Sequence, residues 1–96
     1  MGGNVQPLKL LRSRPPAYPE RAREAGIEGV VLIRAVILTD GTPSSLVLLN
    51  SPDQDLGQAA LEAVRQWRYQ PVLLNGAPIE AIATITVNFR LDGTGA

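Results

Sequence analysis

Cysteine and histidine are both absent from this chain of 96 residues. Without cysteine, the chain has no disulfide, no thiol nucleophile and no thiolate ligand for a metal ion. Without histidine, it also lacks the commonest general base and the commonest ligand of transition metals. No phosphate-binding glycine motif is present either. We therefore expect no catalytic residues, no metal site and no cofactor, and we conclude that the chain is not an enzyme.

An excess of charge of one sign is lacking as well. Nine Lys and Arg residues balance nine Asp and Glu residues, which leaves a net charge of +0 at pH 7. Because nucleic-acid binding needs an excess of cations, we expect no nucleic-acid partner. The apolar runs are far shorter than the roughly 18 residues that span a bilayer, and no signal peptide is visible. Met1-Gly2-Gly3 is typical of residues added before a natural sequence, so we expect the natural protein to extend upstream.

What the sequence does contain is typical of one small globular domain. Apolar residues make up 45% of the chain and charged residues 19%, which is sufficient for a hydrophobic core. Residues 1–17 include Pro7, Pro15 and Pro16, and we expect a flexible, extended tether there. The domain itself is expected over residues 18–92, with a short tail at 93–96.

Five elements are predicted after the tether, in the order helix, strand, strand, helix, strand. Pro19 and Gly26 bound the first helix, and Asp40-Gly41 forms the hairpin turn between the first two strands. Ser51, Asp53 and Asp55 supply capping oxygens for the second helix, which Pro71 ends. The periodicity places helices over 19–26 and 56–70 and strands over 29–38, 44–51 and 79–91.

The second helix carries one apolar stripe, formed by Leu56, Ala59, Ala60, Ala63, Val64 and Trp67. We expect Trp67 to be the largest core anchor between this helix and the sheet. Trp67 and Tyr69 would otherwise resemble a platform for stacking bases, but a neutral domain argues against that role.

The predicted fold is α+β, with two helices packed on one face of a three-stranded antiparallel sheet in the spatial order 2-1-3. In this arrangement the last strand is a long edge, and its interior has neither proline nor lysine to protect it. Such an edge can accept a peptide as an additional strand. The alternative is that the tail of the chain covers the edge.

Several motifs occur together at a consistent spacing. Tyr18-Pro19 opens the first helix, Gly29 precedes the first strand, and "AALEAVRQWRYQP" precedes a strand that ends in Phe-x-Leu. In this combination, residues 18–91 resemble the TonB C-terminal domain. The chain departs from the family at Gly57, where an acidic residue is frequent, and at Ala35, where a larger apolar residue is common.

The resemblance implies the periplasmic part of an energy transducer from a Gram-negative bacterium. An N-terminal region outside this chain would anchor it in the inner membrane and contact motor proteins driven by the proton gradient. The domain would bind the TonB box of outer-membrane TonB-dependent transporters, which import siderophores or vitamin B12, as a strand added to its own last strand. A TonB- or TolA-like periplasmic scaffold, or a sensor appendage of a larger envelope protein, stays open as an alternative.

The resemblance also implies which residues contact the partner. They lie before and in the first helix and along the last strand, and comprise Arg14, Pro15, Pro16, Ala17, Tyr18, Pro19, Arg21, Ala83, Thr84, Ile85, Thr86, Val87, Asn88, Phe89 and Arg90. Structural roles are expected for Gly29, Gly41, Trp67, Tyr69 and Pro71.

One predicted surface is not explained by the resemblance. The sheet face away from the helices would carry Val30, Leu32, Val36, Leu38, Val47 and Leu49, whereas an open face is normally polar. Because a large apolar patch usually marks an interface, we expect this face to be covered. Either a second copy of the domain, forming a homodimer, or residues 5–11 folding back would cover it.

Overall fold

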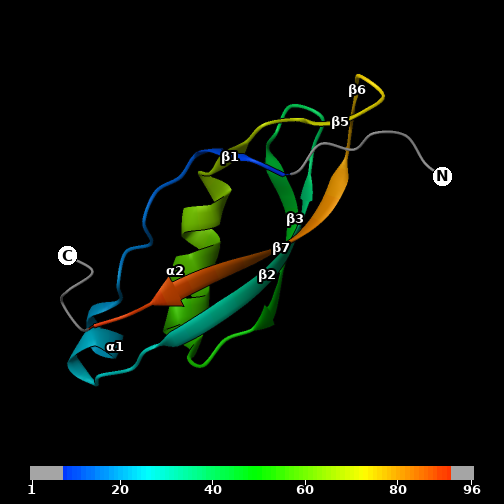
Figure 1. The fold of residues 1–96 in the computed structure, drawn as a ribbon. Coiled ribbons are helices and arrows are strands. Elements are labelled where there is room, and N and C mark those ends of the chain that lie inside the picture. Colours follow the sequence, from blue (N-terminus) through cyan, green and yellow to red (C-terminus); the bar gives the residue numbers. More distant parts are fainter. Residues whose placement is uncertain (1–7, 92–96) are drawn as a thin grey trace.

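The computed structural model describes residues 8–91 and shows one long helix against a three-stranded antiparallel sheet (Figure 1). Strand β2 (Gly29–Ile37) lies between β3 (Pro43–Asn50) and β7 (Ala81–Phe89). Helix α2 (Gln54–Arg65) covers one face, and the short helix α1 (Glu20–Glu24) lies at one end of the sheet. The predicted α+β class, with two helices and antiparallel strands, is confirmed, and the three predicted strands lie in the order β3-β2-β7.

Two additional small sheets were not predicted. They pair β1 with β4 and β5 with β6, and the strands are β1 (Leu10–Arg12), β4 (Arg68–Tyr69), β5 (Val72–Leu74) and β6 (Ala77–Ile79). We predicted no strand in residues 1–17, yet β1 lies there and is paired with residues more than fifty positions away. A local pattern of three residues gives no sign of such a distant partner.

Two predicted elements have other bounds in the structure, because residues at their ends pair with other segments. Helix α2 ends at Arg65 and does not continue to Pro71, because Arg68 and Tyr69 leave the helical path to pair with β1. The last strand begins at Ala81, since Ile79 pairs with Val72 in the β5–β6 hairpin. Asn75-Gly76 forms the turn of the β5–β6 hairpin, and φ angles of 52° and 85° give it the primed-turn geometry.

The start of α2 follows the capping prediction at Asp53. The Asp53 carboxylate accepts the backbone N–H of Asp55 at 2.9 Å and of Leu56 at 3.3 Å. The Ser51 hydroxyl does not cap the helix, but donates to the Asp53 carbonyl at 2.6 Å. Gly26 follows α1 with a φ of 72°, which fits its predicted role in ending that helix.

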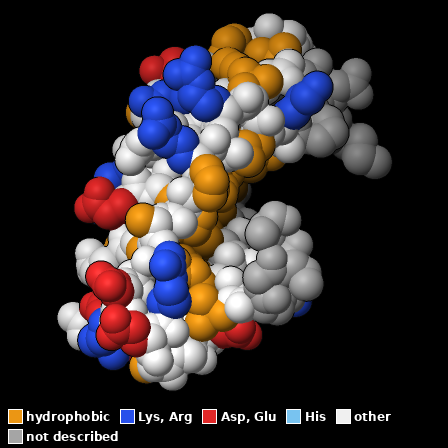
Figure 2. Space-filling view, turned by 90° about the vertical axis from the view of Figure 1, so that its left-hand side faces the viewer, with side chains coloured by type: hydrophobic (Ala, Val, Ile, Leu, Met, Phe, Trp, Pro, Cys, Tyr) orange, Lys and Arg blue, Asp and Glu red, His pale blue; other side chains and the backbone are white. Residues whose placement is uncertain are grey.

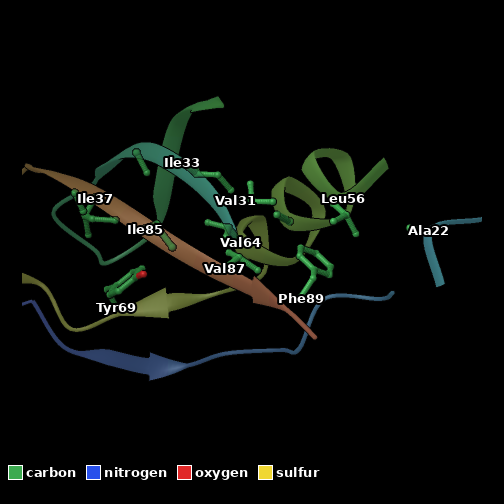
Figure 3. Close-up of a cluster of buried hydrophobic side chains, with 13 residues drawn as sticks. Ala22, Val31, Ile33, Ile37, Leu56, Val64, Tyr69, Ile85, Val87 and Phe89 are labelled. Carbon is green, nitrogen blue, oxygen red and sulfur yellow. The ribbon is translucent and has the colours of Figure 1, made fainter. Parts of the chain in front are cut away.

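The core lies between α2 and the inner face of the sheet (Figure 3). Alternating residues of β2 and β7 meet the apolar stripe of α2, and the buried set from these elements comprises Val31, Ile33, Ala35, Ile37, Ala83, Ile85, Val87, Phe89, Leu56, Ala60, Ala63 and Val64. Gly57 faces β3 closely, since a Cβ added there would lie 2.9 Å from Leu48 Cδ2. The absence of a side chain at Gly57 therefore allows the helix to approach β3.

The hairpin turn between β2 and β3 is held against β4 at Gly41. The backbone N–H of Tyr69 donates to the Gly41 carbonyl at 2.9 Å, and Tyr69 itself is buried in the core cluster. A Cβ added to Gly41 would lie 1.9 Å from the Tyr69 carbonyl oxygen, and the Gly41 φ is +88°. Only glycine fits there without moving the backbone of β4.

Replacing this glycine tests how tightly β4 is held. Gly41→Ala combines an unfavourable φ with a backbone clash, so we expect it to lower the free energy of unfolding by about 2–4 kcal/mol. Gly76→Ala is the matched control, because Gly76 also has a positive φ, +85°, but nothing within 4 Å of the added Cβ. That variant should lose only about 1 kcal/mol. Urea unfolding measures both, and equal losses would contradict a tight contact at Gly41.

Candidate functional site

The outer edge of β7, the side of Ala81–Phe89 that faces away from β2, is the feature on which the site is built. Strand β7 pairs with β2 along its whole length, from Gly29 opposite Phe89 to Ile37 opposite Ala81. Within residues 8–91, no strand pairs with the other side of β7. Since alternate residues of an antiparallel strand direct their backbone groups to opposite sides, this β7 edge presents a row of unpaired N–H and C=O groups.

The side chains of β7 do not protect its edge. The strand contains no proline and no charged residue, which are the usual means of blocking further pairing. Ala83, Ile85 and Val87 are buried in the core, so a partner at the edge could meet these residues only through their backbone. The residues that alternate with them along β7 are exposed and point to the other face of the sheet, namely Ile82, Thr84, Thr86 and Asn88.

An aromatic contact brings the N-terminal segment to the end of β7. The rings of Tyr18 and Phe89 meet edge to face, with centroids 5.4 Å apart and an angle of 89°. The Tyr18 hydroxyl donates to the Ile27 carbonyl. Burial, together with the charge of Glu28, raises the pKa of Tyr18. The predicted contact residue Tyr18 is therefore a structural link between the N-terminal segment and β7.

Trp67 anchors the same segment farther upstream. Its indole Nε1–H donates to the Arg14 carbonyl at 2.8 Å, and the backbone N–H of Gln70 donates to the Lys9 carbonyl at 2.7 Å. Trp67 is only partly buried where it packs against the core. The prediction that it is the largest core anchor is wrong, because α2 ends at Arg65 and Trp67 no longer follows the helical stripe.

Residues 14–18, which we call the N-terminal flank, are thus fixed at both ends. A hollow of about 380 Å³ lies near the end of β7, lined by Glu28, Gly29, Val30, Asn88, Phe89 and Arg90. A second hollow of about 250 Å³ separates the flank from α2, lined by Arg14, Pro15, Ala17, Ala59, Glu62, Ala63 and Gln66. Figure 2 shows hydrophobic side chains gathered in a band across one face of the molecule.

Arg21, predicted to contact the partner, is engaged within the domain. Its guanidinium lies 2.7 Å from the Asp53 carboxylate and 2.6 Å from that of Asp55. These hydrogen bonds raise the pKa of Arg21, and the bond from Arg21 is the main cause that lowers the pKa of Asp53. Arg21 therefore ties α1 to the start of α2, with its side chain still 57% exposed.

Gly29, for which the sequence predicts a structural role, lies directly against Pro52. Its φ is +155°, and an added Cβ would lie 2.5 Å from Pro52 Cγ. Glu28 beside it accepts the backbone N–H of Leu91 at 2.8 Å. The chain is thus held where β2 begins and after β7 ends.

Two further findings concern residues 8–91 only. In this range, no cluster of three or more His, Cys, Asp or Glu side chains is placed to hold a metal ion. The helices in the same range are too short or too polar to cross a membrane.

Comparison with known proteins gives consistent matches. The profile described as Gram-negative bacterial TonB protein C-terminal matches residues 14–91. The TonB protein of Vibrio cholerae is 38% identical over 79 residues, which are 81% of this chain and 32% of that protein. The solution structure of the Pseudomonas aeruginosa TonB C-terminal domain has a TM-score of 0.74 at 31% identity, and the match covers 88% of this chain and 87% of that one. For TonB2 of Vibrio anguillarum the TM-score is 0.64 at 33% identity, over 95% and 87% of the two chains.

The fold and the unpaired β7 edge define a small α+β domain built around an antiparallel sheet. The chain belongs to the TonB C-terminal family, and the resemblance seen in the sequence is confirmed. Proteins of this family are energy transducers, so the prediction that the chain is not an enzyme is also confirmed. The chain spans about a third of the length of the Vibrio cholerae relative, 32%.

The pairing of Arg21 with Asp53 predicts a dependence of stability on pH. Because the folded pKa of Asp53 lies below its ordinary value of 3.8, the stabilisation is complete above that value and is lost as the pH falls through the folded pKa. Asp53→Asn keeps a capping oxygen but removes the charge. We expect the wild-type chain to be the more stable at pH 7, and the difference to shrink below about pH 4.

Urea unfolding between pH 7 and pH 2 measures this difference. Arg21→Gln should show a pH dependence in the same direction. The double variant should add little to Arg21→Gln, because that change already removes the pairs with both Asp53 and Asp55. A difference that does not vary with pH would show that the ion pair contributes nothing to stability.

The bond from Trp67 to Arg14 makes a prediction about the N-terminal flank. Trp67→Phe keeps a large ring but removes the indole donor, so we expect a loss of about 0.5–1 kcal/mol. Hydrogen exchange should accelerate at the amides of β1 and the flank, while those of β2 change little. Trp67→Ala serves as the comparison that also removes the apolar contact. Unchanged exchange in β1 and the flank would show that Trp67 does not hold them.

Proposed function

We propose that this chain is the peptide-binding domain of a TonB-type energy transducer and that it binds the TonB box of outer-membrane transporters at the β7 edge. The observation that supports this most directly is the edge of a nine-residue strand with which no other strand of residues 8–91 pairs. A peptide strand would complete the ladder, with backbone hydrogen bonds providing affinity and alternating side chains setting the register.

The expected affinity is modest. A short peptide would form about four to six backbone hydrogen bonds, each contributing a net binding free energy of about 0.5–1.5 kcal/mol. Ordering the peptide opposes binding, so a weak and reversible complex results. Such reversibility suits a domain that must engage and release several transporters.

The predicted contact residues divide into two groups in this proposal. Along β7, the backbone of residues 83–89 forms the ladder, while Thr84, Thr86 and Asn88 present side chains beside the added strand. The N-terminal flank borders the peptide. Pro19 and Arg90 lie at the same end of the site as the flank. Arg21 supports the site by holding α1 on α2, since its guanidinium is already paired.

Membership of the family supports a proposal for the role of the whole protein. We propose that a region outside this chain anchors the protein in the inner membrane and contacts a motor driven by the proton gradient. The domain would then lie in the periplasm and transmit force to a bound transporter, allowing uptake of siderophores, vitamin B12 or similar nutrients.

A titration with a synthetic TonB-box peptide tests the proposal. We expect chemical-shift changes in the 96-residue chain along β7 and around Tyr18, with a peptide of the same composition in scrambled order as control. Methylating successive backbone nitrogens of the peptide should weaken binding about tenfold at alternate positions, because only every second N–H faces β7.

Other outcomes would count against strand addition. Shift changes away from β7, or a methylation series without alternation, would show a different binding mode. No binding at millimolar peptide would favour the periplasmic scaffold or sensor role instead.

A further inference from the structure

A single charged side chain lies within the three strands of the main sheet. Strands β2, β3 and β7 contain nine, eight and nine residues, and among them only Arg34 is charged. Its neighbours Ile33 and Ala35 are fully buried, whereas Arg34 is exposed. Because strand side chains alternate between faces, Arg34 lies on the sheet face away from α2, which we call the open face.

Apolar residues surround Arg34 on the open face. Leu32 and Val36 precede and follow it on the same side of β2, and Val47 is its partner on β3. The most exposed apolar side chains of the main sheet are Val30 at 44%, Val47 at 42%, Leu49 at 47% and Ile82 at 75%. The open face therefore combines a broad apolar surface with one central cation.

Arg34 has no partner for its charge among residues 8–91. Its guanidinium takes part in none of the side-chain hydrogen bonds or ion pairs between the described residues. On the β7 side its cross-strand neighbour is Thr84, which is uncharged. A partner that buries this surface would remove water from the Arg34 guanidinium. Unless the partner supplied an anion, a charge would then be buried without a counter-charge, which costs free energy.

The two covers expected from the sequence do not fit this surface. Residues 8–11 do not fold onto the open face, because β1 pairs with β4 and Leu11 is 61% exposed; residues 5–7 lie outside the described range. A second copy packed face to face would bring no carboxylate from its strands. The acids that flank these strands lie outside them, with Glu28 before β2, Asp40 between β2 and β3, and Glu80 before β7.

A membrane surface is also a poorer match than a protein. Recognition of anionic lipids uses clusters of several cations, whereas the strands of the open face contribute one. An apolar sheet face with a single charge matches the side of an amphipathic segment that has apolar residues around one acid.

We propose that the open face is a docking surface for an amphipathic helix of a partner protein, whose apolar side chains surround one carboxylate that pairs with Arg34. Apolar burial provides the affinity, and the Arg34 pair sets the position of the helix and rejects segments that lack the acid. The open face is separate from the β7 edge, so the proposal does not depend on strand addition there.

Three synthetic helical peptides test this surface. Each carries one leucine-rich side, with Glu, Gln or Lys at its centre, and a stable helix is unable to add to β7 as a strand. In titrations of the 96-residue chain, the Glu peptide should shift resonances of Val30, Leu32, Val36 and Val47. We expect it to bind about tenfold more tightly than the Lys peptide.

Charge reversal on the chain makes the test specific. Arg34→Glu should reverse the order and prefer the Lys peptide, while Arg34→Gln should bind the three peptides alike. Arg23→Gln is the matched control, because it removes an exposed cation from α1 and should leave the preference for Glu unchanged.

Five results would overturn the proposal. Equal binding of the three peptides to the unchanged chain would exclude a charge-selective surface, and shifts confined to other regions would exclude the open face. Sedimentation showing a dimer through this face, or Arg34-dependent binding to anionic vesicles without binding to the Glu peptide, would assign the face to another occupant. If Arg34→Gln only caused self-association and no peptide bound, Arg34 would serve solubility alone.

Discussion

Close packing of α2 on the inner face of the sheet is the contact on which the rest of the structure depends. Alanines at 60 and 63 and the bare backbone of Gly57 let the helix approach the strands. Because one face of β2 and β7 is buried in this way, every second residue of these strands points away from α2. It also leaves β7 at the border of the sheet, with its backbone groups unpaired within the described residues.

Long-range contacts then hold the chain around this border. Gly41 accepts a hydrogen bond from β4, Trp67 binds the Arg14 carbonyl, and Tyr18 meets the ring of Phe89. Each contact joins segments that are distant in sequence, and together they turn a proline-containing segment into an ordered flank. The free edge, the ordered flank and the open face are therefore consequences of one packing arrangement.

Local patterns predicted much of this fold because they report local physics. Alternation revealed which side of β2 faces away from the helices, Asp53 marked the start of α2, and the border position of β7 followed from the order of elements. The candidate edge was thus available from sequence. Trp67 was misplaced, since its spacing continued the helical stripe while the backbone had already left the helix at Arg65.

The sequence by itself determined the class of fold, the inward set of strand residues and the absence of thiol and imidazole chemistry. Only the tertiary structure decided the pairing of β1 with β4, the engagement of Arg21 by Asp53 and Asp55, and the lack of a charge partner for Arg34 among the described residues. The physical reason is the range of the forces involved. Periodicity and capping act over a few residues, whereas pairing and ion contacts depend on which distant segments the folded core brings together.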